Sequence, residues 1–444
     1  MKGNISKIER KGRTDGIRAR HRADVMQRVL ETPGIDRTRL AEATGLTNAA
    51  MTRIVQELNS AGLVQDAGLL ETVGENALVF GRGTGPEHGP RHGPGRGRKR
   101  SGLEINAGGG YVLGLSILAF NSGVAMSDIS GRVIEIVQVE PSNISNPVTT
   151  LDEISKVAIA LMDKHDLEPH RVFGAGVAIA GYLDRSGHIL NSSPYLGWPV
   201  FDIRESLAQR LRLNVVIDNA NRCIAIAENR TGSCIGIDEM ILIRAAVGIG
   251  GAVICNGEVV RGDNNRAGHI GHSCVEPNGL QCSCGAKGCL NTVASGWAIL
   301  NQLGLIESGD LEVGDLRSQE AKLRLVLSSN AKNNEGYQAV IRKAGELLAK
   351  HCVGLLHSMA SHSVVLTGPL GRNETYCNGF SRALEKYNID IRILAAYEHT
   401  ISGTAEAASV FALIKHVYTP SFDIQPLLAN ASADNVSRAG GLVL

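Results

Sequence analysis

The sequence contains no apolar run long enough to cross a lipid bilayer. Its first residues, Met-Lys-Gly-Asn-Ile-Ser-Lys, lack the apolar stretch of a secretory signal peptide. Hydrophobic residues make up 43% and charged residues 20% of the 444 positions, which is typical of a soluble globular protein. These features argue against a membrane protein, and we expect the protein to be cytoplasmic. From its length we expect two or three domains.

The sequence also lacks a strong net charge, but the charges it has are unevenly distributed. The net charge is only +1, yet residues 1–100 contain 18 Lys or Arg and 11 Asp or Glu. The remaining 344 residues contain 27 Lys or Arg and 33 Asp or Glu. A basic N-terminal segment therefore precedes an acidic remainder of the chain. This asymmetry favours nucleic-acid binding by the front of the chain. The alternative is a solvated basic tail, which charge alone does not exclude.

Residues 20–64 carry the signals of three short helices and a strand. Apolar residues at helical spacing predict a first helix from Arg20 to Glu31, ended by a Pro-Gly turn. Asp36 can cap a second helix that Gly45 terminates. Thr47 can cap a third helix, whose apolar stripe consists of Ala50, Ile54 and Leu58. Two helices joined by a glycine turn form a helix-turn-helix, and the strand signal after the third helix indicates the winged form.

The third helix carries the residues that we expect to contact DNA. Residues near its start that point away from the apolar stripe would lie in the major groove, against base edges and phosphates. We predict these contacts from Thr47, Asn48, Ala49, Thr52 and Arg53. The alternative, a small helical domain that docks another protein, does not need the local positive charge.

A stretch rich in glycine, proline and arginine occupies residues 81–104. This composition cannot bury a core, so the stretch is predicted to be an extended wing or a linker. Its positive cluster could reach phosphates or a minor groove, or could belong only to a soluble tether: Arg96, Arg98, Lys99 and Arg100. The front of the chain then divides into a polar tail (1–18), a winged helix-turn-helix (19–80) and this wing or linker (81–104).

Residues 268–291 contain the side chains of a metal site. His272, Cys282, Cys284 and Cys289 offer one imidazole and three thiols, which is a ligand set of closed tetrahedral Zn²⁺ sites. Glycines between the last two thiols allow the backbone to fold tightly enough for both to face one ion. His269 is a rival fourth ligand, and the alternative to a metal site is a chance group of free thiols.

The same segment resembles a loop of the ROK family, which comprises bacterial sugar kinases and sugar-responsive repressors. Cys282-Ser-Cys284-Gly285-Ala-Lys-Gly288-Cys289 matches the CxCGxxGC pattern of that loop throughout. In the family this loop holds a structural zinc beside the sugar pocket, and the histidine of a preceding Gly-His pair is the fourth ligand. The resemblance therefore implies His272 rather than His269.

The body of the chain is predicted to contain two α/β halves. Each half opens with a three-stranded antiparallel meander, which suggests an internal duplication with a ligand cleft between the halves. The predicted elements are strands Tyr111–Leu118, Gly123–Ile129, Val133–Val139, Gly174–Ile179, Met240–Ala246, Ala252–Cys255 and Glu258–Val260, and helices Leu151–Lys164, Tyr337–Ser358, Asn373–Lys386 and Thr404–Val417. The resemblance implies the two-lobed, actin-like fold of sugar kinases over about residues 105–418, preceded in ROK repressors by a winged helix. No role is predicted for residues 419–444.

The motifs that ROK kinases use for phosphate binding and catalysis are altered here. Their first phosphate-binding turn, Asp-x-Gly-Gly-Thr, is replaced by residues 116–120, where Leu118 and Phe120 would block the approach of a phosphate. Their second phosphate-binding turn is better preserved in this sequence, at residues 247–251. Their general base, an aspartate, is replaced by Asn219, and an amide cannot hold the proton. Asp218 is a doubtful substitute, because neighbouring side chains on a strand point to opposite faces.

The predicted sugar contacts are altered as well. Residues 181–184 and 191–198 resemble sugar-binding segments of the family, whereas two family glutamates are replaced by His269 and Asn291. Either side chain can accept one hydrogen bond and donate another, so a polyol remains a suitable ligand. The alternative for His269 is a supporting role beside the metal. We predict ligand contacts from Asn191, Asp218, Asn219, His269 and Asn291.

These features predict a sugar-responsive transcriptional regulator, a repressor, that binds double-stranded operator DNA as a homodimer or homotetramer. A sugar or sugar derivative in the cleft would change lobe closure and so the spacing of two recognition helices. Structural zinc is the expected cofactor, and no catalysis is expected. One alternative is a zinc-containing, ATP-dependent sugar kinase with an appended DNA-binding domain. Another is a regulator that responds to no small molecule.

Overall fold

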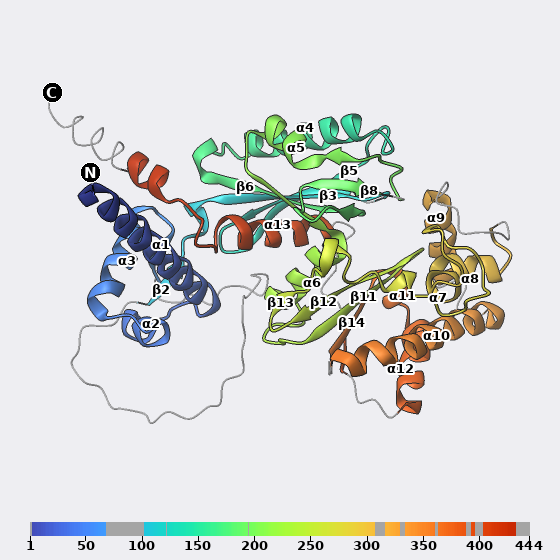
Figure 1. The fold of residues 1–444 in the computed structure, drawn as a ribbon. Helices are drawn as coiled ribbons and strands as arrows, with labels where there is room; N and C mark the ends of the chain where they lie inside the picture. The colour runs from blue at the N-terminus through green and yellow to red at the C-terminus, as the bar shows by residue number, and fades with distance from the viewer. Residues whose placement is uncertain are drawn as a thin grey trace.

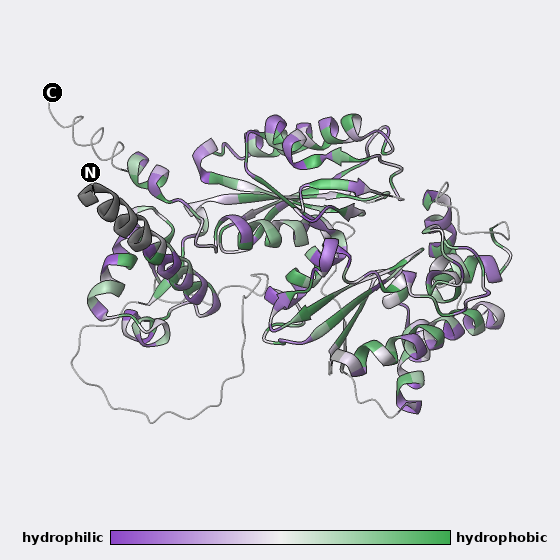
Figure 2. Cartoon of the chain, viewed as in Figure 1, coloured by the Kyte–Doolittle hydropathy of each residue, from purple (hydrophilic) through white to green (hydrophobic). Residues whose placement is uncertain are grey.

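A computed structural model of the chain describes residues 2–67, 102–120, 122–193, 195–306, 316–328, 334–359, 363–387, 392–395 and 403–431. It contains an N-terminal helical domain and two lobes, each built on a five-stranded sheet (Figure 1). Apolar residues follow the strands of both sheets, whereas hydrophilic residues gather on the helices (Figure 2). Within the described ranges, no helix is long and apolar enough to cross a membrane.

The N-terminal domain contains three helices, α1 (Lys2–Glu31), α2 (Arg37–Thr44) and α3 (Asn48–Ser60). The caps are those that the sequence predicts. A carboxylate oxygen of Asp36 accepts the N–H groups of Thr38 and Arg39, and Gly45 ends α2 with a φ of 68°. Thr47 Oγ1 accepts the N–H of Ala50 at 3.3 Å and so caps α3. The inner face of α3 is buried through Met51, Ile54, Val55 and Leu58.

The predicted start of the first helix was wrong. α1 begins at Lys2 rather than near Arg20, so residues 2–18, assigned to a polar tail, are helical. Polar and charged residues dominate this segment, so it carries no apolar stripe that would mark a helix. Arg18 and Arg22 hold α1 against α3 through ion pairs with Glu57, at N···O distances of 2.8 and 3.0 Å.

The wing predicted after α3 is an antiparallel pair of strands, β1 (Val64–Asp66) and β2 (Leu103–Ile105). The second strand crosses the boundary predicted between residues 104 and 105, so it belongs with the helix-turn-helix. The connection between the strands, residues 68–101, lies outside the described residues. The predicted phosphate contacts within it lie outside them too: Arg96, Arg98, Lys99 and Arg100.

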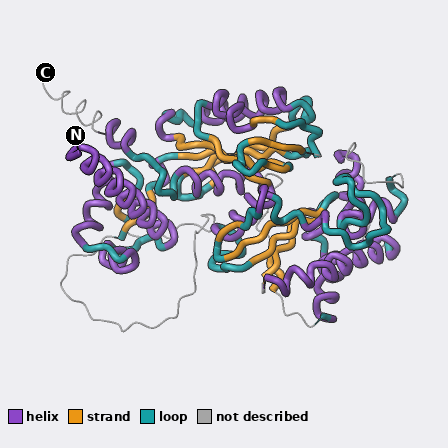
Figure 3. The backbone as a smooth tube through the Cα atoms, viewed as in Figure 1, coloured by secondary structure: helices purple, strands orange, loops and turns teal. Residues whose placement is uncertain are grey.

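The two lobes repeat one strand arrangement, as the two meanders predict. Three antiparallel strands come first, and two parallel strands then extend each sheet beside the first of the three. The orders are β10-β6-β3-β4-β5 and β15-β14-β11-β12-β13, so the two lobes share the predicted repeat of strand arrangement. The strands of both lobes are the main orange segments in Figure 3. The bounds are β3 (Tyr111–Ile117), β4 (Ser122–Asp128), β5 (Val133–Val139), β6 (Val172–Ile179) and β10 (Val215–Asn219), then β11 (Met240–Ala245), β12 (Ile249–Cys255), β13 (Glu258–Val259), β14 (Ser363–Thr367) and β15 (Arg392–Ala395). A smaller sheet contains β7 (Tyr182–Leu183), β8 (Ile189–Ser192) and β9 (Phe201–Asp202).

Two further predicted boundaries, the starts of β12 and α4, differ from the structure by more than two residues. β12 begins at Ile249, so Gly250 lies inside the strand rather than in the turn before it. A Cβ there would collide with the side-chain amide of Asn221, which explains the glycine. Helix α4 (Pro147–Lys164) begins before Leu151, because the Asn146 side chain accepts the N–H of Thr149 at 3.0 Å and Pro147 suits the first helical position.

Helices cover and separate the two sheets. α4 and α5 (Ile203–Leu211) lie over one face of the first sheet, and α13 (Gly403–His416) packs against the other face (Figure 1). α6 (Ala220–Arg230) contacts both α13 and β12, so α6 and α13 lie between the lobes. The remaining helices belong to the second lobe: α7 (Asn291–Ala294), α8 (Gly296–Gln302), α9 (Leu316–Leu327), α10 (Glu335–Met359), α11 (Gly368–Gly371) and α12 (Glu374–Lys386).

The segment that follows α13 joins the first lobe to the N-terminal domain. The rings of Phe422 and Phe173 meet edge to face, with centroids 4.9 Å apart. Ile424 and Leu427 are buried in an apolar cluster that also contains residues of α1, α2 and α3. Residues 419–431, for which the sequence predicts no role, therefore form part of the interface between the two domains.

Arg171 forms a polar contact across the same interface. Its Nη1 donates to the carbonyl oxygens of Ala61 and Gly109, at 3.1 and 3.0 Å. Ala61 caps the C-terminal end of α3, and Gly109 precedes the first strand of the lobe. One guanidinium group of the first lobe thus holds the end of the helix that was predicted to read DNA.

The close packing of α13 on the first sheet predicts the effect of two glycine substitutions. Gly114 of β3 faces the α13 backbone, and a Cβ there would collide with the carbonyl oxygen of Ala405. We expect Gly114→Ala to lower the free energy of unfolding by about 1–3 kcal/mol through overpacking. The control Gly354→Ala should raise it by up to about 1 kcal/mol, because Gly354 is an exposed residue of α10 with open space around it. Urea unfolding of both variants measures the difference, and shifts of the same sign would contradict the packing.

Candidate functional site

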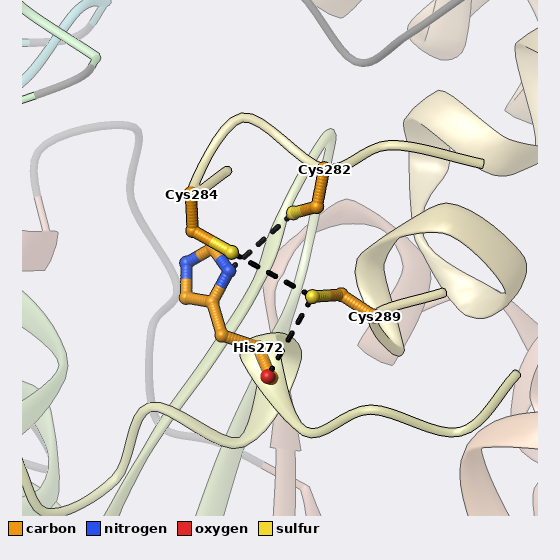
Figure 4. A group of neighbouring side chains, drawn as sticks. All are labelled: His272, Cys282, Cys284 and Cys289. Carbon is orange, nitrogen blue, oxygen red and sulfur yellow. Dashed lines mark hydrogen bonds between the residues drawn. The ribbon is translucent and has the colours of Figure 1, made fainter. Parts of the chain in front are cut away.

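The predicted metal ligands lie together in the structure. One ring nitrogen of His272 and the sulfurs of Cys282, Cys284 and Cys289 all lie within 4.8 Å of one another. Cys282 Sγ is 3.5 Å from His272 Nδ1, and Cys284 Sγ is 3.6 Å from Cys289 Sγ (Figure 4). Tetrahedral zinc with ordinary bond lengths needs S···N separations of about 3.6 Å and S···S separations of about 3.8 Å. The donor set and its spacing therefore suit a zinc ion.

Local backbone geometry brings these four side chains together. His272 ends a short 3-10 helix, η4 (Ile270–His272), and the thiols lie on the loop that follows. Cys289 pairs with Cys274 as an isolated β-bridge, which brings the end of the loop back to its beginning. Gly288 has a φ of 63°, and a Cβ there would collide with the carbonyl of Glu276. Glycine is thus required at that position for the loop to close.

His269, the rival ligand, lies outside the metal cluster. Its ring packs edge to face on Tyr182, with centroids 4.6 Å apart, and it lines the cleft between the lobes. Burial, helped by the positive charge of Arg222, lowers the pKa of His269 to about 4, so its imidazole is neutral at physiological pH. Tyr182 also touches the cluster, because its hydroxyl lies 3.1 Å from His272 Nε2. A metal on Nδ1 would leave the ring proton on Nε2, directed at this hydroxyl.

The cleft predicted between the lobes is present. A cavity of about 130 Å³ lies between residues 118–120 of the first lobe and residues 244–250 of the second. An adjoining space of about 520 Å³ reaches the metal loop at Ser283 and Cys284. The two spaces share four side chains: Tyr182, Tyr195, His269 and His272. Together they form one elongated site that ends at the metal cluster.

Residues from both segments that the sequence analysis compared with phosphate-binding turns line the smaller cavity. Leu118 and Phe120 both line the smaller cavity, where the first turn of a kinase would need residues without side chains. Gly248 and Gly250 line its opposite wall. The smaller cavity is therefore bordered by apolar side chains on one side and by glycines on the other.

Asn219, which the sequence predicts at the position of the kinase base, lines the cavity but is held by the protein. Its Nδ2 donates to the carbonyl oxygen of Gly181 at 3.0 Å. Its Oδ1 accepts the N–H of Asn221 at 2.9 Å and so caps α6. Both ends of the amide are thus engaged in local structure, and neither is suited to removing a proton from a ligand.

The structure places Asp218 outside the cavity, contrary to its predicted role as a ligand contact. The side chain is fully buried, and its two oxygens lie 2.5 Å from Arg222 Nε and 2.5 Å from Arg261 Nη1. Because Asn219 faces the cavity, the preceding strand residue faces away from it. Arg261, which the sequence did not single out, is the partner that explains this buried carboxylate.

Two further predicted ligand contacts also lie elsewhere. Asn191 is exposed on β8 and lines neither space of the cleft. Asn291 is fully buried, and its Oδ1 accepts the N–H of Ile249 at 2.7 Å. Asn291 thus fixes the start of β12 from behind the cavity wall, and of the five predicted contacts only Asn219 and His269 line the cleft.

Several cleft residues were missed by the sequence analysis, among them Tyr182, Tyr195 and Arg244. Tyr182 and Tyr195 lie within residues 181–184 and 191–198, the two segments that resemble sugar-binding segments of the family. These segments were identified from the sequence, but their tyrosines were not predicted to line the cleft. Arg244 is the only charged residue of β11, and its neighbours in the strand, Ile243 and Ala245, are both buried. A lone charge inside an apolar strand was the signal that could have identified it.

The predicted DNA contacts are grouped on one exposed surface of the N-terminal domain. Thr47, Asn48, Ala49, Thr52 and Arg53 are all exposed at the start of α3, opposite its buried face. Thr52 Oγ1 donates to the carbonyl oxygen of Asn48 at 2.8 Å, which leaves its methyl group free on this surface. The arrangement is that of a helix available to a groove.

Comparison with known proteins shows which protein family has this architecture. The match to the ROK family extends over residues 123–410, more than half of the chain. The chain belongs to the ROK family. The xylose repressor of Bacillus subtilis (strain 168) is 25% identical over 280 residues, which cover 63% of this chain and 66% of that repressor. The match thus spans about two thirds of the repressor's length. The DNA-binding transcriptional dual regulator NagC of Escherichia coli (strain K12) is 22% identical over 431 residues, covering 94% of this chain and 98% of NagC.

Solved ROK structures share the fold. A ROK family transcriptional regulator, a homologue of the E. coli MLC protein, matches with a TM-score of 0.72 at 19% identity, over 93% of this chain and 100% of that one. The ROK hexokinase of Thermus thermophilus matches with a TM-score of 0.56 at 21% identity, over 69% and 99%. The first match includes the N-terminal domain, whereas the second spans a smaller share of the chain.

The metal cluster of this ROK chain makes a prediction about its thiols. Cys284→Ser should reduce the bound metal from about one ion per chain to a small fraction and lower the melting temperature, because a closed site needs all four ligands. Cys274→Ser is the matched control, since this exposed thiol lies outside the cluster. Elemental analysis and thermal unfolding of the two variants test the prediction. Equal metal content in both would contradict the assigned ligand set.

Proposed function

We propose that this ROK protein is a DNA-binding transcriptional regulator, a repressor of carbohydrate-related genes that a sugar derivative controls. The observation that carries the proposal is an exposed helix-turn-helix surface joined to a kinase-like cleft without a base. Leu118, Phe120 and Asn219 occupy the positions where a kinase needs an open phosphate turn and a carboxylate. The likeness to the xylose repressor and to NagC supports the proposal, since the NagC match extends over nearly the whole chain.

The start of α3 is the proposed DNA-reading surface. Asn48 and Arg53 can form paired hydrogen bonds with purine edges, and Ala49 can contact a thymine methyl group. Thr47 can donate its hydroxyl to a phosphate, Thr52 can contact a base through its methyl group, and the wing cluster at residues 96–100 would add further phosphate contacts. A homodimer or homotetramer would present two such helices to two operator half-sites.

An effector in the cleft would act through the connection between the first lobe and α3. Arg171 holds Ala61 at the end of α3 and Gly109 at the start of the lobe. A ligand that prefers one degree of lobe closure would shift the position of this guanidinium group, and with it the recognition helix. The expected result is weaker operator binding when the cleft is filled.

Zinc is the proposed ion of the His272, Cys282, Cys284 and Cys289 cluster. Four protein ligands leave no open coordination position, so the ion would have a structural role rather than a catalytic one. Free thiols beside a metal require a reducing compartment, which agrees with DNA binding in the cytoplasm. Through Tyr182, the ion would stabilise the wall of the cleft that carries His269.

If the protein were instead an ATP-dependent sugar kinase, it would phosphorylate a sugar and release ADP. We expect no ADP release above background from the zinc-loaded chain with hexoses, N-acetylated amino sugars or xylose, because losing a positioned base typically costs about 10²–10⁴ in rate. A coupled ADP assay measures this, with a ROK glucokinase as the positive control. Zinc-dependent turnover well above background would replace the regulator with the kinase.

Operator binding predicts a specific role for Arg53. Arg53→Ala should weaken binding to the promoter fragment upstream of the protein's own gene by roughly 10- to 100-fold, as expected for the loss of one paired contact to a base. Arg317→Ala, which removes an exposed arginine of α9, is the matched control and should bind normally. Fluorescence anisotropy at two salt concentrations provides the measurement. A wild-type chain without salt-sensitive affinity for any promoter fragment would refute the proposal.

A further inference from the structure

Arg244 occupies an unusual position for a charged residue. It lies in β11, paired with Gly250 of β12 on one side and Thr367 of β14 on the other. Its neighbours Ile243 and Ala245 are fully buried on the opposite face of the sheet. The alternation of the strand directs Arg244 to the face that lines the small cavity between the lobes.

The charge of Arg244 is not balanced within the described part of the chain. Its side chain forms no ion pair and no hydrogen bond with any described residue, and its Nε is buried without an acceptor. Neither space of the cleft is lined by an Asp or a Glu. A buried N–H of a charged group without an acceptor is costly, so such a group is expected to gain one from a ligand.

The surroundings of Arg244 also favour a negative group. Gly248 and Gly250 line the cavity, and α6 begins there with Ala220 and Asn221, which places the positive end of its dipole on the same space. The Tyr195 hydroxyl lies against Gly248, where a Cβ would be 2.6 Å from its oxygen. Burial raises the pKa of Tyr195 well above its usual range, so this hydroxyl remains a hydrogen-bond donor.

We infer that the effector is an anionic sugar derivative, and that Arg244 binds its phosphate or carboxylate group. This inference rests on the proposed function, because it assumes that the cleft binds a sugar derivative. At about 130 Å³, the cavity at Arg244 is smaller than the roughly 300 Å³ of ordinary ligand pockets, and it suits a single small group. The adjoining space of about 520 Å³, lined by Tyr182 and His269, would take the polyol. Leu118 and Phe120 fill the side of the cavity that the phosphates of a nucleotide would need.

The experiment compares neutral and anionic members of matched pairs on the metal-loaded full chain. Isothermal titration with glucose and glucose 6-phosphate, and with N-acetylglucosamine and its 6-phosphate, tests the phosphate. Glucuronate tests the carboxylate, and inorganic phosphate and ATP test a bare anion and a nucleotide. We expect an anionic sugar to bind at least about 10-fold more tightly than its neutral partner, as one charge-assisted contact provides. This preference should shrink as salt is raised.

Arg244→Gln removes the charge and keeps most of the length of the side chain. It should weaken binding of the anionic sugar by roughly 10- to 100-fold and leave the neutral partner unchanged. Arg185→Gln is the matched control, because Arg185 is 83% exposed and lies outside both spaces of the cleft. Arg244→Lys keeps the charge and should keep part of the preference. If Arg244→Gln does not fold, the affinity of Arg244→Lys for the anionic sugar and the salt dependence of wild-type binding test the inference instead.

Three outcomes would overturn the inference, and they separate it from the proposed function. A neutral sugar that binds as tightly as its phosphate and releases the promoter fragment would overturn the inference and keep the regulator. Inorganic phosphate or ATP that binds as tightly as any sugar phosphate would overturn the assignment to a sugar derivative. Promoter binding without affinity for any of these probes would overturn both the inference and the proposed control by a sugar.

Discussion

The buried carboxylate of Asp218 is the interaction on which the arrangement of the two lobes depends. Arg222 of α6 and Arg261, which follows β13 of the second lobe, each lie 2.5 Å from it. Arg222 also donates to the carbonyl oxygen of Asn265 at 2.9 Å, beside Arg261 in the chain. Removing Asp218 would leave the buried charge of Arg222 uncompensated, which is strongly unfavourable. The lobes are thus joined at the base of the cleft, next to Asn219, whose N–H also donates to Asp218 at 2.7 Å.

From this junction, α13 provides a continuous path to the N-terminal domain. The helix packs against α6 and against the first sheet, so it contacts the elements that border the cleft. Its C-terminal end leads directly into Ile424 and Leu427, which share an apolar cluster with α1, α2 and α3. Arg171 adds a polar contact to the end of α3. Because packed interiors transmit small displacements, a change in lobe closure would alter the position of the recognition helix.

Local signals in the sequence were sufficient for much of this fold, and long-range contacts account for the rest. The caps at Asp36 and Thr47 and the grouping of the four candidate metal ligands could be predicted, because each depends on residues close in sequence. The ligand role given to Asp218 was wrong, because its partner Arg261 is distant in sequence and only folding brings the two together. Asn291 was misassigned for a related reason. A polar residue predicted to face a ligand instead satisfies the backbone N–H of Ile249, and sequence alone does not reveal that pairing.

The metal loop and the cleft are linked through one aromatic residue, which explains why a structural ion would matter to sensing. Tyr182 contacts His272 through its hydroxyl and His269 through its ring. An ion that orders the loop would therefore also fix the ring against which His269 packs. The ring of His269 is held against Tyr182, and Asn219 is held at both ends of its amide, so both side chains have fixed positions in the cleft wall. An ion in the cluster, the ring of Tyr182 and the wall of the cleft would therefore form one continuous set of contacts.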